Sequence, residues 1–335
     1  ADATIDNGTT ALIIAASTVD GDLTIKSGHA SGITDSGTVT VGGNLAATTD
    51  AGSGVINMGT LAVNGTIALA TNGNGNATVV NDDGLNLAAS TVGGNLAATA
   101  TTGNMQQSGA LAITGTSAFT TSASNATITL ETATNNFTGA VAFTSSGDSG
   151  NVSVKDTDAM NLAASTVGGT LTVVAGGVLT QSGNVTAGGV VELTGGGAGI
   201  STSGNITTTA DAVNYNSNTT LTGDITVTTA NGALSFDGTL DSDSSARDLT
   251  VSGGSGAVTF TGAVGATNAL DTIDITNTGG ITASSSMAAA SVALDAGTSN
   301  NISFVNNSNA IDTLTITSAN NVTVDNGTST LDMAA

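Results

Sequence analysis

The stretch Leu85-Asn86-Leu87-Ala88-Ala89-Ser90-Thr91-Val92-Gly93-Gly94 decides the fold of this chain. It returns almost unchanged at residues 160–169, and a looser copy stands at residues 13–21, so that Ile14, Leu87 and Leu162 hold equivalent positions. Because repetition at a fixed period is typical of arrays of stacked structural units, this superrepeat of about 75 residues predicts a repeat architecture. We also expect the copies to stack their aliphatic side chains in one column.

Shorter runs inside each copy alternate apolar and small polar residues, as in Thr38-Val39-Thr40-Val41 and Thr127-Ile128-Thr129-Leu130. Alternation at period two predicts strands with one buried face. Pairs such as Gly-Gly, Asn-Gly and Ser-Gly separate these runs and predict turns. No stretch combines helical spacing with caps at both ends, and the chain has no proline, which strand ladders exclude. The sequence therefore predicts an all-β protein.

Two all-β architectures compete, namely a string of antiparallel sandwich domains and a parallel β-helix. The repeat is continuous, its predicted core residues are small aliphatics, and aromatic residues make up only 2% of the chain. These features favour a single continuous parallel β-helix over residues 1–335, with stacked coils of about 18–25 residues. The superrepeat is clear over residues 1–196, and residues 197–335 follow the same pattern in a degenerate form. Residues 237–248 are the best candidate for a protruding loop.

The composition limits the possible partners. Acidic residues outnumber basic residues 25 to 3, for a net charge of −22, so a phosphate-binding surface for nucleic acid is not expected. No run of 18 apolar residues predicts a transmembrane helix, and no signal peptide is visible. The absence of cysteine excludes disulfides and thiol chemistry. The chain begins and ends within the repeat pattern, so we expect it to be a section of a longer protein.

The units LNLAASTVGGNLAA (85–98), MNLAASTVGGTLTVVAGGVLTQSGNVTAGG (160–189) and NNFTGAVAFTSSG (135–147) resemble the β-strand repeats of very large bacterial exoproteins. These are similar to filamentous haemagglutinin and other two-partner-secretion adhesins. The resemblance covers nearly the whole chain and is tightest over residues 12–196. It implies a right-handed parallel β-helix, secretion to the bacterial cell surface, and a role in adhesion, biofilm or surface fibres. No secretion-domain segment accompanies the repeats.

Carboxylate pairs are the first candidates for chemistry: Asp82 with Asp83, Asp156 with Asp158, and Asp241 with Asp243. A glycosidase needs two carboxyls held across the scissile bond, one with a raised pKa. These acids lie in Gly/Ser/Asn turns, where we expect them to be solvated, so no catalytic residue is assigned. Calcium prefers such oxygen ligands, and Asp241, Asp243, Asp82 and Asp83 are its candidates, although no calcium-loop motif is present. No other cofactor is expected.

Two single residues complete the candidates. His29 has no cysteine or second histidine with which to bind a metal, so a loop histidine is expected. Tyr215 is either a platform for a sugar or, as we expect, a half-buried strand aromatic.

These observations predict a non-catalytic, extracellular structural or adhesive β-solenoid, a rod or stalk of a bacterial surface or biofilm protein. Its partners would be a carbohydrate or protein of the host or matrix, with end-to-end or lateral contacts between copies. The alternative is a self-assembling subunit of a fibre, sheath or surface layer. A β-helix enzyme acting on polysaccharides is a third possibility.

Overall fold

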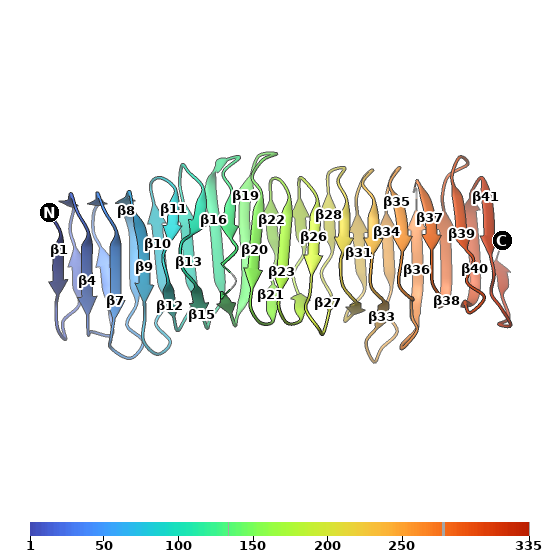
Figure 1. The fold of residues 1–335 in the computed structure, drawn as a ribbon, viewed down its shortest axis with the longest axis horizontal. Helices are drawn as coiled ribbons and strands as arrows, with labels where there is room; N and C mark the ends of the chain where they lie inside the picture. The colour runs from blue at the N-terminus through green and yellow to red at the C-terminus, as the bar shows by residue number, and fades with distance from the viewer. Residues whose placement is uncertain (133, 277–278, 335) are drawn as a thin grey trace. The chain divides into compact units, whose positions relative to one another are not determined.

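A computed structural model describes residues 1–132, 134–276 and 279–334 of the chain. These residues form a parallel β-solenoid of about 16 turns and contain no helix (Figure 1). The chain divides into two units, the first made of residues 1–162 and 166–169 and the second of residues 163–165 and 170–335. The all-β prediction is confirmed, and so is the parallel arrangement.

Residues 1–70 of unit 1 have one long strand per turn in sheet A and two short strands per turn in sheet B. The long strands are β1 (Ala3–Asp6), β4 (Leu23–Ser27), β7 (Leu45–Thr49) and β9 (Thr66–Ala70). The short strands are β2 (Leu12–Ile14), β3 (Ser17–Val19), β5 (Ile33–Asp35) and β6 (Val39–Val41), and β8 (Ile56–Val63) continues both of their rows.

The remainder of unit 1 reverses this arrangement, because sheet B now holds the long strands and sheet A the short pairs. The long strands are β10 (Ala77–Asn81), β13 (Leu96–Ala100), β16 (Ser117–Ser124) and β19 (Ala140–Ser146). The pairs are β11 (Leu85–Leu87) with β12 (Ser90–Val92), β14 (Met105–Gln107) with β15 (Leu111–Ile113), and β17 (Ile128–Leu130) with β18 (Asn136–Phe137). A second reversal follows at β20 (Val152–Asp156), β21 (Met160–Leu162) and β22 (Ser165–Val167).

In unit 2 the long strands again belong to sheet A. They are β23 (Leu171–Ala175), β26 (Val191–Thr194), β29 (Val213–Tyr215), β32 (Leu234–Phe236), β35 (Ala257–Phe260), β37 (Gly280–Ala283), β39 (Asn301–Phe304) and β41 (Asn321–Val324). Sheet B holds four pairs: β24 (Leu179–Gln181) with β25 (Val185–Ala187), β27 (Ile200–Thr202) with β28 (Ile206–Thr208), β30 (Thr219–Leu221) with β31 (Ile225–Thr228), and β33 (Leu240–Ser242) with β34 (Leu249–Ser252). It ends with β36 (Leu270–Thr276), β38 (Ala288–Asp295), β40 (Ala310–Ser318) and β42 (Asp332–Ala334).

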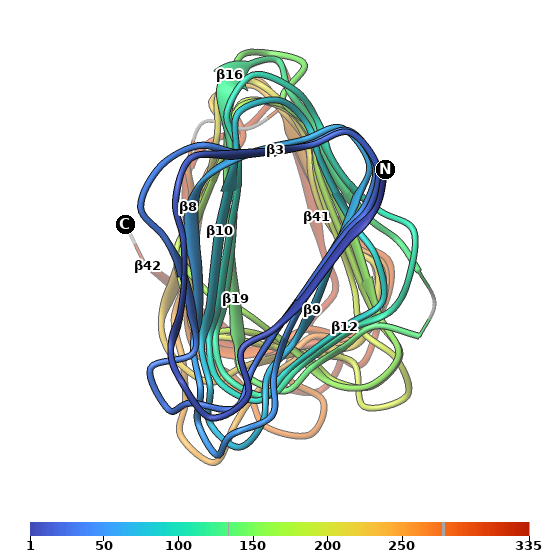
Figure 2. The ribbon, with the colours of Figure 1, turned by 90° about the vertical axis from the view of Figure 1, so that its left-hand side faces the viewer.

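Residues that stack on each other lie one turn apart in sequence. Leu23 pairs with Leu45, Leu45 with Ile67, and Ile67 with Leu87. Each of these steps falls within the predicted coil length of about 18–25 residues, which is thereby confirmed. Viewed end-on in Figure 2, the blue N-terminal turns outline closed loops. The inward side chains of these turns, among them Leu23, Leu45 and Ile67, are almost completely buried.

The prediction that equivalent positions of the superrepeat stack in one column is wrong. Ile14 lies in sheet B, Leu87 in sheet A and Leu162 again in sheet B. The superrepeat spans three complete turns and part of a fourth, so successive copies fall on opposite sheets of unit 1. It therefore encodes the reversal of the two sheets, while the column is built from residues about one turn apart.

The glycine pairs that end the copies at residues 85–94 and 160–169 are needed because two turns approach closely there. A Cβ atom added to Gly93 would lie 1.8 Å from the carbonyl oxygen of Gly73 in the preceding turn. One added to Gly168 would lie 2.3 Å from the carbonyl oxygen of Gly147. Only glycine leaves room for the backbone at such contacts.

Aromatic side chains are few, but they form part of the core. All six phenylalanines are buried, and in unit 2 Tyr215, Phe236 and Phe260 form a stack with one ring in each turn. The ring centroids of Tyr215 and Phe236 are 4.6 Å apart, and those of Phe236 and Phe260 are 5.6 Å apart. Tyr215 is fully buried, so the prediction of a half-buried side chain is wrong.

Candidate functional site

Each sheet reversal in unit 1 leaves the end of one strand without a backbone partner, and a side chain takes its place. At the first reversal, Asn81 lies at the inward position that ends β10. Its Oδ1 accepts the Val63 N–H at 2.8 Å, and its Nδ2 donates to the carbonyl oxygens of Val63 at 3.0 Å and Gly84 at 2.7 Å. The buried Asn81 amide therefore pairs with the backbone at the end of β8 in place of a neighbouring strand.

Asp156 occupies the equivalent position in the next copy of the superrepeat. Its carboxylate accepts the Phe137 N–H at 2.7 Å and the Asp158 N–H at 2.8 Å. The side chain is fully buried, so the expectation of a solvated turn carboxylate is wrong for Asp156. Burial raises the pKa of Asp156, and the two backbone N–H groups oppose this rise because they favour the charged form.

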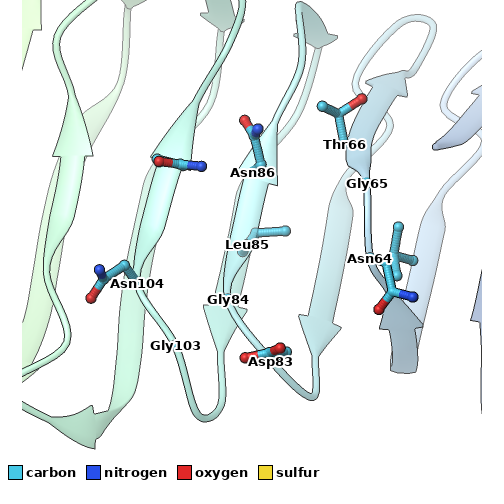
Figure 3. Close-up of a pocket in the computed structure, with 11 residues that line it drawn as sticks. Asn64, Gly65, Thr66, Asp83, Gly84, Leu85, Asn86, Gly103 and Asn104 are labelled. Carbon is cyan, nitrogen blue, oxygen red and sulfur yellow. The ribbon is translucent and has the colours of Figure 1, made fainter. Parts of the chain in front are cut away.

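A polar groove opens beside the first reversal (Figure 3). The ladder between β9 and β11 begins only at the pair Thr66 and Asn86, so the turn at residues 63–65 and the turn at residues 83–85 diverge. The resulting space has a volume of about 400 Å³. Its polar side chains come from three successive turns: Asn64, Thr66, Asp83, Asn86, Asn104 and Gln106.

Three side chains of the groove rise from consecutive strands in one row. Asn86 pairs with Thr66 of β9 on one side and with Gln106 of β14 on the other. Neighbouring strands are about 4.8 Å apart, so the row presents one polar side chain about every 4.8 Å. No aromatic or basic side chain lines the described groove, and Asp83 is its only charged residue.

Many turn asparagines of the described chain form a side-chain hydrogen bond to the next turn. The side-chain amides of Asn86 and Gln106, at the centre of the groove, form none. Asn44 Oδ1 accepts the Thr66 N–H, and Asn95 Oδ1 accepts the Thr116 N–H, both at 2.8 Å. The same bond recurs at other turns of the described chain, from Asn76, Asn104, Asn184, Asn205, Asn218 and Asn231. Asn86 Oδ1, by contrast, is buried and has no hydrogen-bond partner.

The four calcium candidates do not form one cluster. Asp82 and Asp83 are exposed in the turn after β10, and Asp82 faces a separate space of about 230 Å³ lined by Thr38, Thr60 and Thr101. Asp83 Oδ1 accepts the Thr102 hydroxyl at 3.3 Å. Within residues 1–132, 134–276 and 279–334, no group of three or more acidic, histidine or cysteine residues is suited to a metal ion.

Asp241 and Asp243 are each engaged with protein groups. Asp241 accepts the backbone N–H of Thr267 at 2.8 Å. Asp243 forms two hydrogen bonds with Arg247, at 3.0 and 2.8 Å, and this guanidinium lowers the pKa of Asp243. Residues 240–242 form strand β33, with Leu240 and Ser242 buried, so the prediction of one protruding loop over 237–248 is wrong.

The remaining candidates are His29 and Tyr215, and neither lines the polar groove of the described chain. His29 Nδ1 accepts the Ser31 N–H at 3.0 Å within its own turn. The buried Tyr215 hydroxyl makes no hydrogen bond. Burial raises the pKa of Tyr215, and the neighbouring Thr202 hydroxyl, which donates to Gln181 Oε1 at 2.9 Å, opposes this rise to a smaller extent.

The ladders and the capped strand ends define a parallel β-solenoid repeat protein. A family model for repeats of unknown function (DUF5649) matches residues 1–58, 74–144 and 149–202, more than half of the chain. The chain belongs to this family. The three matches begin at the same intervals as the copies of the anchor stretch, so one family unit corresponds to one superrepeat.

No curated protein and no solved structure matches the chain. Among the described residues, no helix has the length and apolar character needed to cross a membrane.

Proposed function

We propose that the chain is a non-catalytic structural or adhesive section of an extracellular bacterial protein. It would serve as the stalk of a surface or biofilm protein of the filamentous-haemagglutinin kind. Support comes from the bonding between turns in each unit. The strands of the described residues pair in parallel, and side-chain amides add further bonds between turns. Such bonding suits a section that must persist outside the cell.

A single observation carries this proposal. The side chains that end strands at the sheet reversals, Asn81 and Asp156, bond to backbone groups of the neighbouring turn. Side chains thereby pair with the backbone at the ends of β8 and β18, where the sheets change their arrangement. Since open strand edges invite aggregation, this capping suits a long scaffold built from many repeats.

The location of the protein in its source cells tests the extracellular part of the proposal. Antibodies against the purified chain should label intact cells, and protease added outside should remove the label. Label found only after the cells are broken open would contradict the proposal.

The non-catalytic part needs a separate measurement. The purified chain should release neither reducing ends nor unsaturated products from a polysaccharide panel. Release of product that an Asp82→Asn/Asp83→Asn variant abolishes would support an enzyme instead. Electron microscopy of the same material should show separate particles, and uniform filaments would support the self-assembling subunit.

A further inference from the structure

We propose that the groove beside the first sheet reversal binds a neutral oligosaccharide, with Asn86 and Gln106 as its central contacts. The site is made of Asn64, Thr66, Asp83, Asn86, Asn104 and Gln106 in three successive turns. The inference deepens the adhesive part of the proposed function, and it rests on that function only for access to an extracellular glycan.

One amide of the groove is unsatisfied. Asn86 Oδ1 is buried and accepts no hydrogen bond. An unpaired buried acceptor destabilises the folded chain. Asn86 lines the groove, so a rotation of its amide toward a sugar hydroxyl would give this oxygen a donor.

Several amides of the groove are left available to a ligand. The side chains of Asn64 and Gln106 make no hydrogen bond to the described protein, and Asn104 uses only its oxygen, which accepts the Thr127 N–H at 2.9 Å. Each amide presents both a donor and an acceptor, as does each hydroxyl of a sugar. Polyhydroxylated ligands therefore match this lining better than purely apolar or purely cationic ones.

The charge at the groove is acidic. Asp83 lines the groove, Asp82 lies next to it, and no basic residue lines the groove. The whole chain carries a net charge of −22. An anionic sugar or a phosphate would find no counter-charge there and would be repelled. These charges favour an uncharged ligand.

The groove also has dimensions that suit a short glycan. A volume of about 400 Å³ lies within the usual range of ligand pockets, roughly 300–1,000 Å³. Thr66, Asn86 and Gln106 repeat at the strand spacing of about 4.8 Å, which is comparable to the length of one sugar ring. A short glycan would therefore lie along the row, contacting one side chain per turn.

Saturation-transfer NMR and calorimetry on the full chain test the proposal with four neutral trisaccharides: cellotriose, maltotriose, mannotriose and triacetylchitotriose. We expect saturable binding of at least one, with a Kd of about 1 mM or tighter. Asn86→Ala and Gln106→Ala should each weaken it about tenfold, the effect of one lost hydrogen bond. Asn161→Ala is the matched control, because Asn161 holds the position equivalent to Asn86 in the next copy of the repeat.

Three results would overturn the proposal. One is the absence of saturable binding to all four sugars. Another is binding that Asn86→Ala and Gln106→Ala leave unchanged while their melting temperatures equal that of the wild type. The third is preferential binding of trigalacturonate in the presence of calcium, since this would show a cation-bridged acidic ligand. A failure of sugar binding together with surface labelling of intact cells would reject the groove and leave the proposed function standing.

Discussion

Replacing Asn81 by alanine should destabilise unit 1 strongly, because one side chain satisfies three backbone groups there. The Asn81 side chain is 1% exposed and makes hydrogen bonds of 2.8, 3.0 and 2.7 Å to Val63 N, Val63 O and Gly84 O. Asn81→Ala leaves the N–H and carbonyl of Val63 unpaired beside the buried end of β8. At about 1–3 kcal/mol for each of these two unsatisfied groups, we expect a loss of about 2–6 kcal/mol.

Hydrogen exchange and urea unfolding measure this loss. Exchange of backbone amides at residues 61–63 should rise first, since turns of a solenoid contact only their neighbours and open locally. The urea midpoint should fall as well. Asn81→Asp keeps the acceptor but places a buried carboxylate against the carbonyl oxygens of Val63 and Gly84, so its loss at neutral pH should be at least as large as that of Asn81→Ala.

Asn95→Ala is the control for the lead prediction. Asn95 also bonds to the next turn, but it is exposed and its Oδ1 accepts only the Thr116 N–H. Water replaces this bond, so the loss should stay at about 0.5–1.5 kcal/mol. A loss at Asn81→Ala no greater than at Asn95→Ala, with unchanged exchange at residues 61–63, would refute the capping role of Asn81.

Three further predictions follow from buried polar groups and from charge. Asp156→Asn should destabilise the protein, because Asp156 Oδ2 accepts the Phe137 N–H and Oδ1 accepts the Asp158 N–H, and an amide nitrogen in either place cannot accept. Since burial raises the folded pKa of Asp156, the wild type loses stability as the pH rises through that pKa, so the deficit of the variant should narrow there. Urea midpoints of variant and wild type measured against pH check this, and a variant more stable than the wild type at neutral pH contradicts it. Tyr215→Phe should leave the urea midpoint unchanged or raise it, because the buried hydroxyl has no partner; a loss above about 1 kcal/mol would reveal a hydrogen bond to this group. Calcium and magnesium at equal concentration should shift the melting temperature equally, because cations screen the net charge of −22; a shift specific to calcium would support a site at Asp82 and Asp83 or at Asp241 and Asp243.

Some residues of the site can be recognised from the sequence, and others cannot. Asn81 and Asp156 end strands at an inward position, where the alternation of Ala77, Val79 and their equivalents calls for an apolar side chain. A polar residue at such a position is a signal that the strand edge needs a partner. Asn86 gives no comparable signal, because an outward asparagine on a strand is ordinary. Only the tertiary structure shows that its oxygen is buried and unpaired.

Strand positions, coil length and the burial of alternate aliphatic residues follow from the sequence by itself, because period-two alternation and glycine-rich turns are local properties of the chain. The tertiary structure decided which residues stack. The superrepeat exceeds three turns by part of a turn, so identical stretches fall on opposite sheets. The similarity of the copies does not reveal the length of this extra part of a turn. The groove exists for the same reason: where the sheets exchange roles, two neighbouring turns separate, and the distance between them depends on the path of the backbone around the coil.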